Sequence, residues 1–344
     1  MSHPVAVATT TAEKSRKSFS VLSGTEQPLI TSDRTVSGNG GFGFEGGCVY
    51  QIDQQYHLFT AELVAEPLWS RTVLAHWTSS DGIVWARVSS LRESTGDFNG
   101  QDRRAAYFSP MPIYDDETER WQFFYVSYRS SPGIANRNHD GMIWRAQSIQ
   151  AGRGGIGGPY VDQDVAMRPD ENSQQWEGHQ GTDSFFAFRA QSGWIGLYGS
   201  CDVENYPDSK WVVGIALSDS LTGTWTRAAL GNPLPAEPEF IENPVVVTLD
   251  DGTFLSVYEN DALDPACARS IGIMTSTDGL EWTREEPIVV PDFLCPWASR
   301  IRTPLSFLPE GDGWRIFFTA FDDRGTLPGS TSYGNVGSIF VQRS

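Results

Sequence analysis

Short stretches of alternating apolar and polar residues, separated by turn sequences, run through most of the chain. Three segments share one pattern: a strand, a Ser/Asp/Gly turn and a strand that carries a tryptophan. They span residues 73–85, 213–225 and 271–282. Asp and Gly tolerate the positive φ angles that tight hairpin turns require, so each segment predicts a β-hairpin. No stretch of comparable length has the 3.6-residue period of a helix, and we therefore expect an all-β protein.

A second kind of hairpin occurs five times. Each copy has a strand rich in β-formers, a turn and an aromatic-rich strand, and the copies begin near residues 45, 107, 182, 242 and 302. The resulting period is about 60 residues and holds four short strands, which is typical of a propeller blade with long loops.

The last repeat lacks one outer strand, because the chain ends soon after the strand at residues 337–341. Residues 19–30, upstream of the first repeat, are well placed to supply it, which would close the ring and remove open sheet edges. We therefore predict an all-β, single-domain five-bladed β-propeller over residues 18–344. Its blades are four-stranded and antiparallel, an N-terminal strand closes the ring, and residues 1–17 form a disordered arm.

Composition narrows the range of partners. The 344 residues carry a formal net charge of −18, and such an acidic field repels polyanions, so we expect no nucleic-acid partner. No stretch approaches the ~20 apolar residues that span a bilayer, so we expect no membrane partner. The first twenty residues lack the apolar core of a secretory signal. We expect a cytoplasmic protein, or a secreted one whose leader has been removed, and the oligomeric state stays open.

The four cysteines lie far apart in the sequence and form no CxxC pair. This spacing favours neither a zinc site nor a dense disulfide framework, so we expect buried free thiols. Cys267 and Cys295 are the one pair for which a disulfide is worth checking. We expect no cofactor.

Acidic residues open three of the five predicted inner strands, namely Glu45, Asp183 and Glu242. Acidic residues are poor strand formers, so their place at the start of apolar strands indicates function. The inner strands of a propeller converge on its axis, and these carboxylates should share one cavity. Grouped carboxylates suit glycosidic bond cleavage, in which one protonates the leaving oxygen and another acts on the anomeric carbon or on water. A third can raise the pKa of the acid by like-charge repulsion.

These residues resemble the five-bladed-propeller glycoside hydrolases: the arabinanases, arabinofuranosidases and β-xylosidases, and more distantly the invertases, inulinases and levansucrases. The resemblance rests on Glu45, on Gly181-Thr-Asp183 and on Glu242-Asn-Pro244. It implies that Glu45 is the general base or nucleophile, that Asp183 tunes the acid, and that Glu242 is the general acid. It also implies hydrolysis of a furanoside or small pentoside, a small carbohydrate or oligosaccharide. Glu45-Gly-Gly stands where the family usually has Asp-Pro, so retention or inversion stays open.

Other side chains are candidates for substrate binding. Aromatic stacking faces for sugar rings are expected from Phe42, Phe44, Trp69, Tyr107, Phe108 and Trp297. His179 is a candidate contact for substrate hydroxyls. Arg302 is expected to pair with a catalytic carboxylate, to bind a sugar hydroxyl, or to form an ion pair between blades. Glu259 and its neighbours are more readily a turn than a substrate contact. No His opens the fifth repeat, where arabinanases often place one near a calcium ion, so we expect no metal.

Two alternatives stay open. A glycoside phosphorylase or transferase would use the same fold with phosphate in place of water, and it would need cations facing the cavity. Arg103, Arg104, Arg300 and Arg302 are candidates for that role. A non-catalytic carbohydrate-binding propeller would use its carboxylates only to bind sugar hydroxyls.

Overall fold

The computed structural model describes residues 16–38, 41–67, 69–133, 138–205, 210–235, 241–260, 265–322 and 334–344. In these ranges the chain consists of β-strands and a few one-turn 3-10 helices, which confirms the all-β prediction. None of the described helices is long and apolar enough to cross a membrane. The predicted N-terminal arm lies outside the described residues as far as residue 15. The backbone N–H of Lys17 donates a 2.7 Å hydrogen bond to Glu285.

Two sheets have four antiparallel strands each, in chain order. The first holds β6 (Ala106–Asp115), β7 (Arg120–Ser130), β8 (Asn138–Ser148) and β9 (Tyr160–Met167). The second holds β10 (Asp183–Ala190), β11 (Gly193–Cys201), β12 (Trp211–Ser218) and β13 (Thr226–Arg227). The 3-10 helices are η1 (Ser32–Arg34), η3 (Arg153–Gly157), η4 (Gln175–Glu177), η5 (Val203–Asn205) and η6 (Pro265–Cys267).

A third sheet orders β14 (Ile241–Thr248), β15 (Phe254–Asn260), β16 (Ser270–Ser276) and β17 (Thr283–Arg284), and β18 (Ile288–Val289) also pairs with β16. The remaining strands form a nine-stranded sheet in two groups. One group is β2 (Gly43–Ile52), β3 (Gln55–Ala65), β4 (Arg71–Ser79) and β5 (Ala86–Glu93). The other is β19 (Arg300–Pro304), β20 (Leu308–Glu310), β21 (Gly313–Phe321), β22 (Gly334–Arg343) and β1 (Phe19–Gly24). The groups meet at one parallel pair, Gly43 with Gly334.

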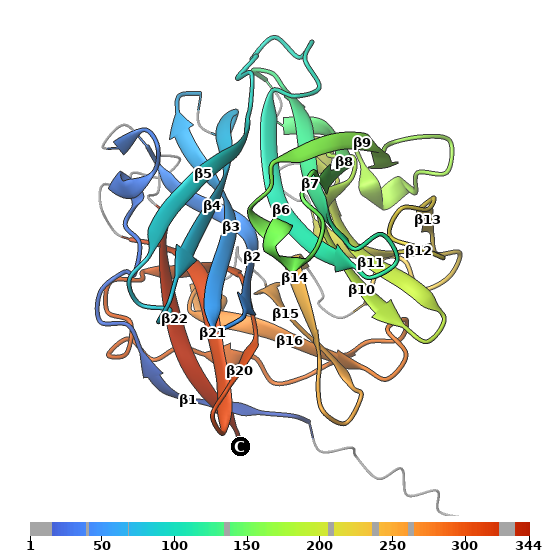
Figure 1. Ribbon diagram of the computed structural model, residues 1–344. Helices are drawn as coiled ribbons and strands as arrows, with labels where there is room; N and C mark the ends of the chain where they lie inside the picture. The colour runs from blue at the N-terminus through green and yellow to red at the C-terminus, as the bar shows by residue number, and fades with distance from the viewer. Residues whose placement is uncertain are drawn as a thin grey trace, which may run out of the picture.

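We call the first strand of each group its inner strand, and β2, β6 and β14 lie toward the centre of the molecule in Figure 1. These inner strands are β2, β6, β10, β14 and β19. Each contacts the next in this order, and β19 contacts β2, so the inner strands form a closed ring. At the outer edge of the last group, β1 pairs antiparallel with β22. This pairing of the N-terminal strand with the last strand confirms the predicted closure.

Every inner strand is irregular close to its start. The register of its pairing with the neighbouring strand shifts directly after one residue: Glu45 in β2, Phe108 in β6, Asp183 in β10, Glu242 in β14 and Ile301 in β19. Such bulges re-aim side chains and are common beside active sites. Proline lacks the N–H of a regular ladder, and Pro110, Pro244 and Pro304 all stand at these shifts. The bulges turn the start of each strand toward the axis.

The predicted tryptophan hairpins are confirmed, with each tryptophan directly before the second strand, and the first and third copies share one turn geometry. The Asp81 carboxylate accepts 2.8 Å hydrogen bonds from the backbone N–H groups of Ile83 and Val84. Asp278 makes the equivalent bonds in the third copy. None of the four cysteines forms a disulfide, so the Cys267–Cys295 bridge is not formed. Cys48, Cys201 and Cys295 are buried as expected, whereas Cys267 is half-buried.

Candidate active site

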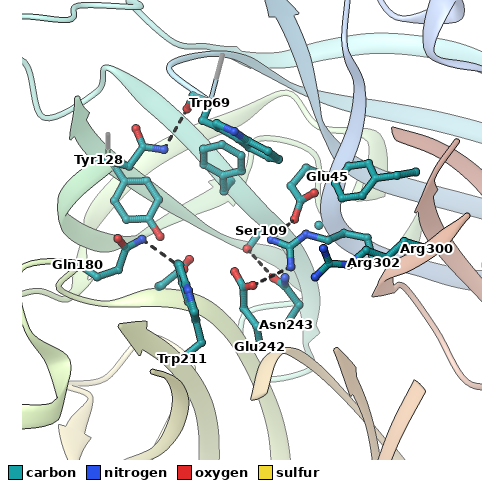
Figure 2. A pocket seen from close by; sticks show the side chains of 15 residues that line it. Glu45, Trp69, Ser109, Tyr128, Gln180, Trp211, Glu242, Asn243, Arg300 and Arg302 are labelled. Carbon is teal, nitrogen blue, oxygen red and sulfur yellow. Dashed lines mark hydrogen bonds and ion pairs between the residues drawn. The ribbon is translucent and has the colours of Figure 1, made fainter. Parts of the chain in front are cut away.

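A cavity of about 290 Å³ opens where the starts of the inner strands converge. Each inner strand contributes at least one side chain to it, among them Glu45 from β2, Ser109 from β6, Asp183 from β10, Glu242 from β14 and Arg302 from β19. Figure 2 shows the side chains of Glu45, Ser109, Glu242 and Arg302 pointing toward a common centre. We call this space the central cavity.

Arg302 lies between two of the predicted catalytic carboxylates. Its Nη2 atom is 3.2 Å from Oε1 of Glu45, and its Nη1 atom is 3.1 Å from Oε2 of Glu242. It also forms an ion pair with Glu259. One guanidinium therefore links three carboxylates, two of which, Glu45 and Glu242, are predicted catalytic residues.

Glu259 is the third carboxylate beside Arg302, and its position there was not predicted from the sequence. The turn predicted there is wrong, because β15 continues through Asn260 and pairs with the start of β14. Glu259 lies directly opposite Glu242 in this pair and is only 2 % exposed. Like charges in opposed positions destabilise a sheet. The positive charge of Arg302 offsets this repulsion.

Burial sets the protonation of these carboxylates. Glu45 and Glu242 are 4 % and 6 % exposed. Removal from water disfavours the charged form, and it raises the pKa of Glu45 to about 7, against the opposing effect of Arg302. Burial raises the pKa of Glu242 well above its ordinary value, again opposed by Arg302 and reinforced by the charges of Glu259, Asp183 and Glu45. Glu242 is thus suited to hold a proton at neutral pH.

Asp183 also lines the cavity and has different partners. Its Oδ1 atom accepts a 2.6 Å hydrogen bond from the backbone N–H of Ser184, and its Oδ2 atom accepts a 3.5 Å bond from the Gln180 amide. Burial raises the pKa of Asp183, while hydrogen bonds and Arg302 oppose the rise. Tyr128 lies beside Gln180 (Figure 2), and burial and Asp183 together raise the pKa of its hydroxyl.

Small polar side chains from the bulges form the floor of the central cavity. The Ser109 hydroxyl donates to Oδ1 of Asn243, and Nδ2 of Asn243 donates to Oγ1 of Thr303, each at 3.4 Å. The Thr303 hydroxyl in turn donates to Oε1 of Glu45 at 3.4 Å. Ser109 and Asn243 have left-handed φ angles of 49° and 52°. The bulged backbone is what brings these groups together.

Aromatic rings form much of the wall: Trp69, Phe108, Tyr128, Trp211 and Phe321 line the cavity. The ring centroids of Trp69 and Phe108 are 6.5 Å apart, and those of Phe108 and Tyr128 are 6.0 Å apart. Asn138 donates a 3.0 Å hydrogen bond to the Trp69 carbonyl, which ties β8 to the segment before β4. Rigid aromatic faces beside hydrogen-bonding groups suit a ligand with both apolar faces and hydroxyl edges, as a sugar ring has.

No protein-family model and no curated protein matches this sequence. Solved structures do resemble it. A family 117 glycoside hydrolase of the marine bacterium Zobellia galactanivorans has a TM-score of 0.67 at 10% identity, over 95% of this chain and 91% of that one. An α-L-arabinofuranosidase of Podospora anserina, solved with cellotriose, scores 0.60 at 12% identity, over 94% and 97% of the two chains. The catalytic domain of a Coprinopsis cinerea α-L-arabinofuranosidase scores 0.62 at 12% identity, over 95% and 96%.

This chain has the β-propeller fold of these enzymes. The resemblance stated from the sequence is therefore confirmed for the fold. At identities of 10–12% the structural similarity shows the fold and assigns no role to any residue. The chemistry of the central cavity depends on the side chains of this chain.

The central cavity brings together several of the predicted site residues and leaves others out. Glu45, Asp183, Glu242, Trp69, Phe108 and Arg302 line it. Phe44, Tyr107 and Trp297 do not: they pack on Trp77, Tyr125 and Phe318, with ring centroids 5.7, 5.5 and 6.0 Å apart. Successive side chains of a strand point to opposite faces. Phe44 therefore faces away from the cavity because its neighbour Glu45 faces into it.

The other predicted contacts also lie apart from the cavity wall. His179 is exposed, and its backbone N–H donates a 3.0 Å hydrogen bond to Glu204. Phe42 is partly buried against the apolar core. Arg103 is exposed, and Arg104 pairs with Asp162 at 3.0 Å. Of the four arginines considered for phosphate, only Arg300 and Arg302 line the cavity.

Sequence reasoning missed Asn138, Gln180, Trp211 and Phe321. Asn138 and Trp211 begin third strands, and Phe321 ends a second strand, and the pattern at the starts of the inner strands does not indicate these positions. Gln180 lies three residues before Asp183 in the approach to β10, a spacing that can be read from the sequence. Among the described residues, no group of three or more His, Cys, Asp and Glu side chains is placed to hold a metal ion.

Proposed function

We propose that this protein is a five-bladed propeller glycoside hydrolase that cleaves a furanoside or small pentoside by carboxylate acid/base catalysis in the central cavity. The observation that carries the proposal is the meeting of Glu45, Asp183 and Glu242, from three different inner strands, in one cavity lined with aromatic rings. The closed ring of inner strands supports five blades, with the nine-stranded sheet counted as two. The arabinofuranosidases of the same fold support the substrate class.

The different surroundings of the carboxylates suggest their roles. Glu242 is the general acid, since its strongly raised pKa keeps a proton available for the leaving oxygen. Glu45 is the base or nucleophile, because its pKa is less raised and Arg302 stabilises its charge. Asp183 tunes Glu242 through its negative charge, which opposes ionisation of the acid.

The contacts of Glu45 and Glu242 with Arg302 are compatible with the upper limit on the separation of such a pair. Glu45 and Glu242 bind neighbouring nitrogens of the Arg302 guanidinium at 3.2 and 3.1 Å. These contacts keep their bonded oxygens within the ~9.5 Å that is the upper limit for glycosidase carboxylate pairs. Both side chains also line the same cavity, as a shared anomeric centre requires.

Hydrolysis is favoured over phosphorolysis by the state of the arginines. Phosphate carries a charge of up to −2 and needs several free cations. Arg302 is already shared by three glutamates, and Arg103 and Arg104 do not line the cavity. Among the described residues, Arg300 is then the one arginine of the cavity without an ion pair that is left to hold phosphate against the surrounding carboxylates.

The test is a panel of 4-nitrophenyl furanosides and pyranosides, assayed with and without inorganic phosphate. Wild type should cleave at least one member in a phosphate-independent way. Glu242→Gln and Asp183→Asn should lower kcat/KM on it by about 10²-fold or more, while the exposed Glu281→Gln serves as the matched control and should leave it unchanged. A wild type that cleaves none of the panel, or variants as active as wild type, would refute the proposal.

A further inference from the structure

Arg300 is the second arginine of the central cavity, and it lacks the partners that Arg302 has. It lies on β19 two residues before Arg302, so both side chains leave the strand on the cavity side. Figure 2 shows the two guanidinium groups side by side. Among the described residues, no ion pair or side-chain hydrogen bond holds the Arg300 guanidinium, and its Nε atom is buried without a hydrogen-bond partner.

An unpaired, partly buried guanidinium is costly. Its buried Nε–H has lost water without gaining an acceptor, and its charge lies in a medium of lower dielectric than water. Burial, together with the neighbouring charge of Arg302, lowers the pKa of Arg300, and Glu259 only partly opposes this effect. An anion that entered the cavity and bound Arg300 would relieve this cost. The free protein therefore presents a cationic position without an anion.

We propose that Arg300 binds a carboxylate of the substrate, and that the substrate contains a uronic acid unit. This inference rests on the proposed function of the cavity as a glycosidase site. A single free guanidinium matches the planar carboxylate with two parallel N–H···O bonds. A phosphate dianion would bring twice the charge next to Glu45, Asp183, Glu242 and Glu259 with only one unpaired cation to balance it.

The remaining surroundings of Arg300 favour this selectivity. Phe321 is the cross-strand partner of Arg300, is 9 % exposed and lines the cavity. An apolar ring beside the guanidinium excludes water and strengthens its attraction for an anion. The acidic groups of the cavity repel any anion, so a uronic acid is accepted only where Arg300 compensates. A neutral sugar offers Arg300 only hydroxyl oxygens, which are weaker acceptors for a guanidinium than a carboxylate is.

The test compares uronic-acid-containing oligosaccharides from pectin, glucuronoxylan and alginate with their carboxyl-reduced, neutral counterparts. Binding is measured by isothermal titration calorimetry in the Glu242→Gln background, which should bind but not cleave. We expect at least one acidic oligosaccharide to bind about tenfold or more tightly than its reduced form. Arg300→Gln should abolish this preference, Arg300→Lys should retain part of it because the charge remains, and the exposed Arg103→Gln should retain all of it.

The contrary results are distinct. The inference is overturned if no acidic oligosaccharide is preferred over its reduced form, if the preference survives Arg300→Gln in a variant with an unchanged melting temperature, or if inorganic phosphate rather than the acidic sugars binds through Arg300. Wild-type hydrolysis is measured separately on the same compounds. Arg300-dependent binding of an acidic sugar that wild type leaves intact would uphold this inference and count against the proposed function. Cleavage of neutral glycosides with no preference for acidic ones would overturn this inference and support the proposed function.

Discussion

The charge balance of the central cavity depends on Arg302. Glu45, Glu242 and Glu259 are all nearly buried, and each pairs with this one guanidinium. Removing one partner of a buried ion pair leaves an uncompensated charge, which costs far more than a surface pair contributes. Arg302 thereby allows several carboxylates to lie close enough together to act on one bond.

Replacing Arg302 should therefore destabilise the protein in a pH-dependent way. We expect Arg302→Met to lower the free energy of unfolding by about 3 kcal/mol or more at pH 8, and by clearly less at pH 5. At the lower pH the carboxylates with raised pKa values take up protons and no longer need the cation. Urea unfolding at both pH values measures this, with the exposed Arg103→Met as control. An equal loss at the two pH values would show that Arg302 does not balance these charges.

The activity should depend on pH through two of the same groups. Glu45 acts without its proton, so kcat/KM should rise as pH increases through about 7, the raised pKa of this residue. Glu242 acts with its proton, so kcat/KM should fall again at higher pH, as the group with the strongly raised pKa ionises. On an aryl glycoside with an activated leaving group, Glu242→Gln should lose the falling limb and keep the rising one. A profile of unchanged shape in this variant would contradict the assignment. Because the groups interact, the two apparent pKa values belong to the pair.

At the residue scale, the sequence predicted the residues that break a local pattern. It missed the residues whose position depends on the face of a strand or on the pairing of two strands. Glu45, Asp183 and Glu242 stood out because carboxylates rarely open apolar strands. Phe44 and Tyr107 lie close in sequence to the starts of two inner strands. Side chains alternate between the faces of a strand, however, and these two pack on Trp77 and Tyr125, away from the cavity. Glu259 was missed because its role depends on pairing with a strand whose register the sequence does not show.

The bulges of the inner strands are the structural elements that aim these side chains. In β2 the bulge follows Glu45 and contains Gly46 and Gly47, whose φ angles are 61° and 113°. A Cβ atom at Gly47 would lie only 1.9 Å from the carbonyl oxygen of Phe59. Only glycine fits there without moving β2 away from β3.

Gly47→Ala should consequently harm both stability and catalysis. We expect a loss of about 3 kcal/mol in the free energy of unfolding, from the clash and the left-handed backbone together, and a lower kcat/KM because Glu45 is displaced. Gly252→Ala is a matched control, since Gly252 also has a positive φ of 80° but has no heavy atom within 4 Å of its added Cβ. It should lose only about 1 kcal/mol and keep its activity. If the two variants behave alike in urea unfolding and in the assay, the bulge is not what positions Glu45.

Elements were predicted well where the signal was local. The starts of the five aromatic hairpins agree with the inner strands, because turn residues and strand formers follow one another directly in the sequence. The bulges were not predicted, although Ser109-Pro110, Asn243-Pro244 and Thr303-Pro304 mark three of them. Their effect arises only when five strands converge, which is a property of the ring.

At the scale of the whole molecule, the two ends of the chain meet in one sheet. β1 pairs with β22 from Phe19 with Arg343 to Gly24 with Ile339. The Phe19 ring packs edge-on against Phe307 and Trp314, with centroids 5.3 and 5.5 Å apart. Without β1, the backbone of β22 would become an exposed edge, and such edges invite aggregation.

Two truncations test this closure. Deleting residues 1–24 should lower Tm by at least about 5 °C and cause association, since it removes β1 and its aromatic contacts. Deleting residues 1–15 keeps β1 and should leave Tm and the monomer-to-aggregate ratio as in the full chain. Thermal unfolding and light scattering after size-exclusion chromatography give the two readouts. Equal behaviour of the two truncated proteins would mean that β1 does not hold the ring closed.

The central claim is that Glu242 is the general acid of a glycosidase site shared with Glu45, and the dependence of the rate on the leaving group tests it most directly. A dinitrophenolate leaves without a proton, whereas an alkyl alcohol needs one. For Glu242→Gln relative to wild type, kcat/KM should fall by about 10²-fold or more on an alkyl glycoside and change little on the matching 2,4-dinitrophenyl glycoside. An equal loss on both substrates would contradict the assignment of Glu242 as the acid.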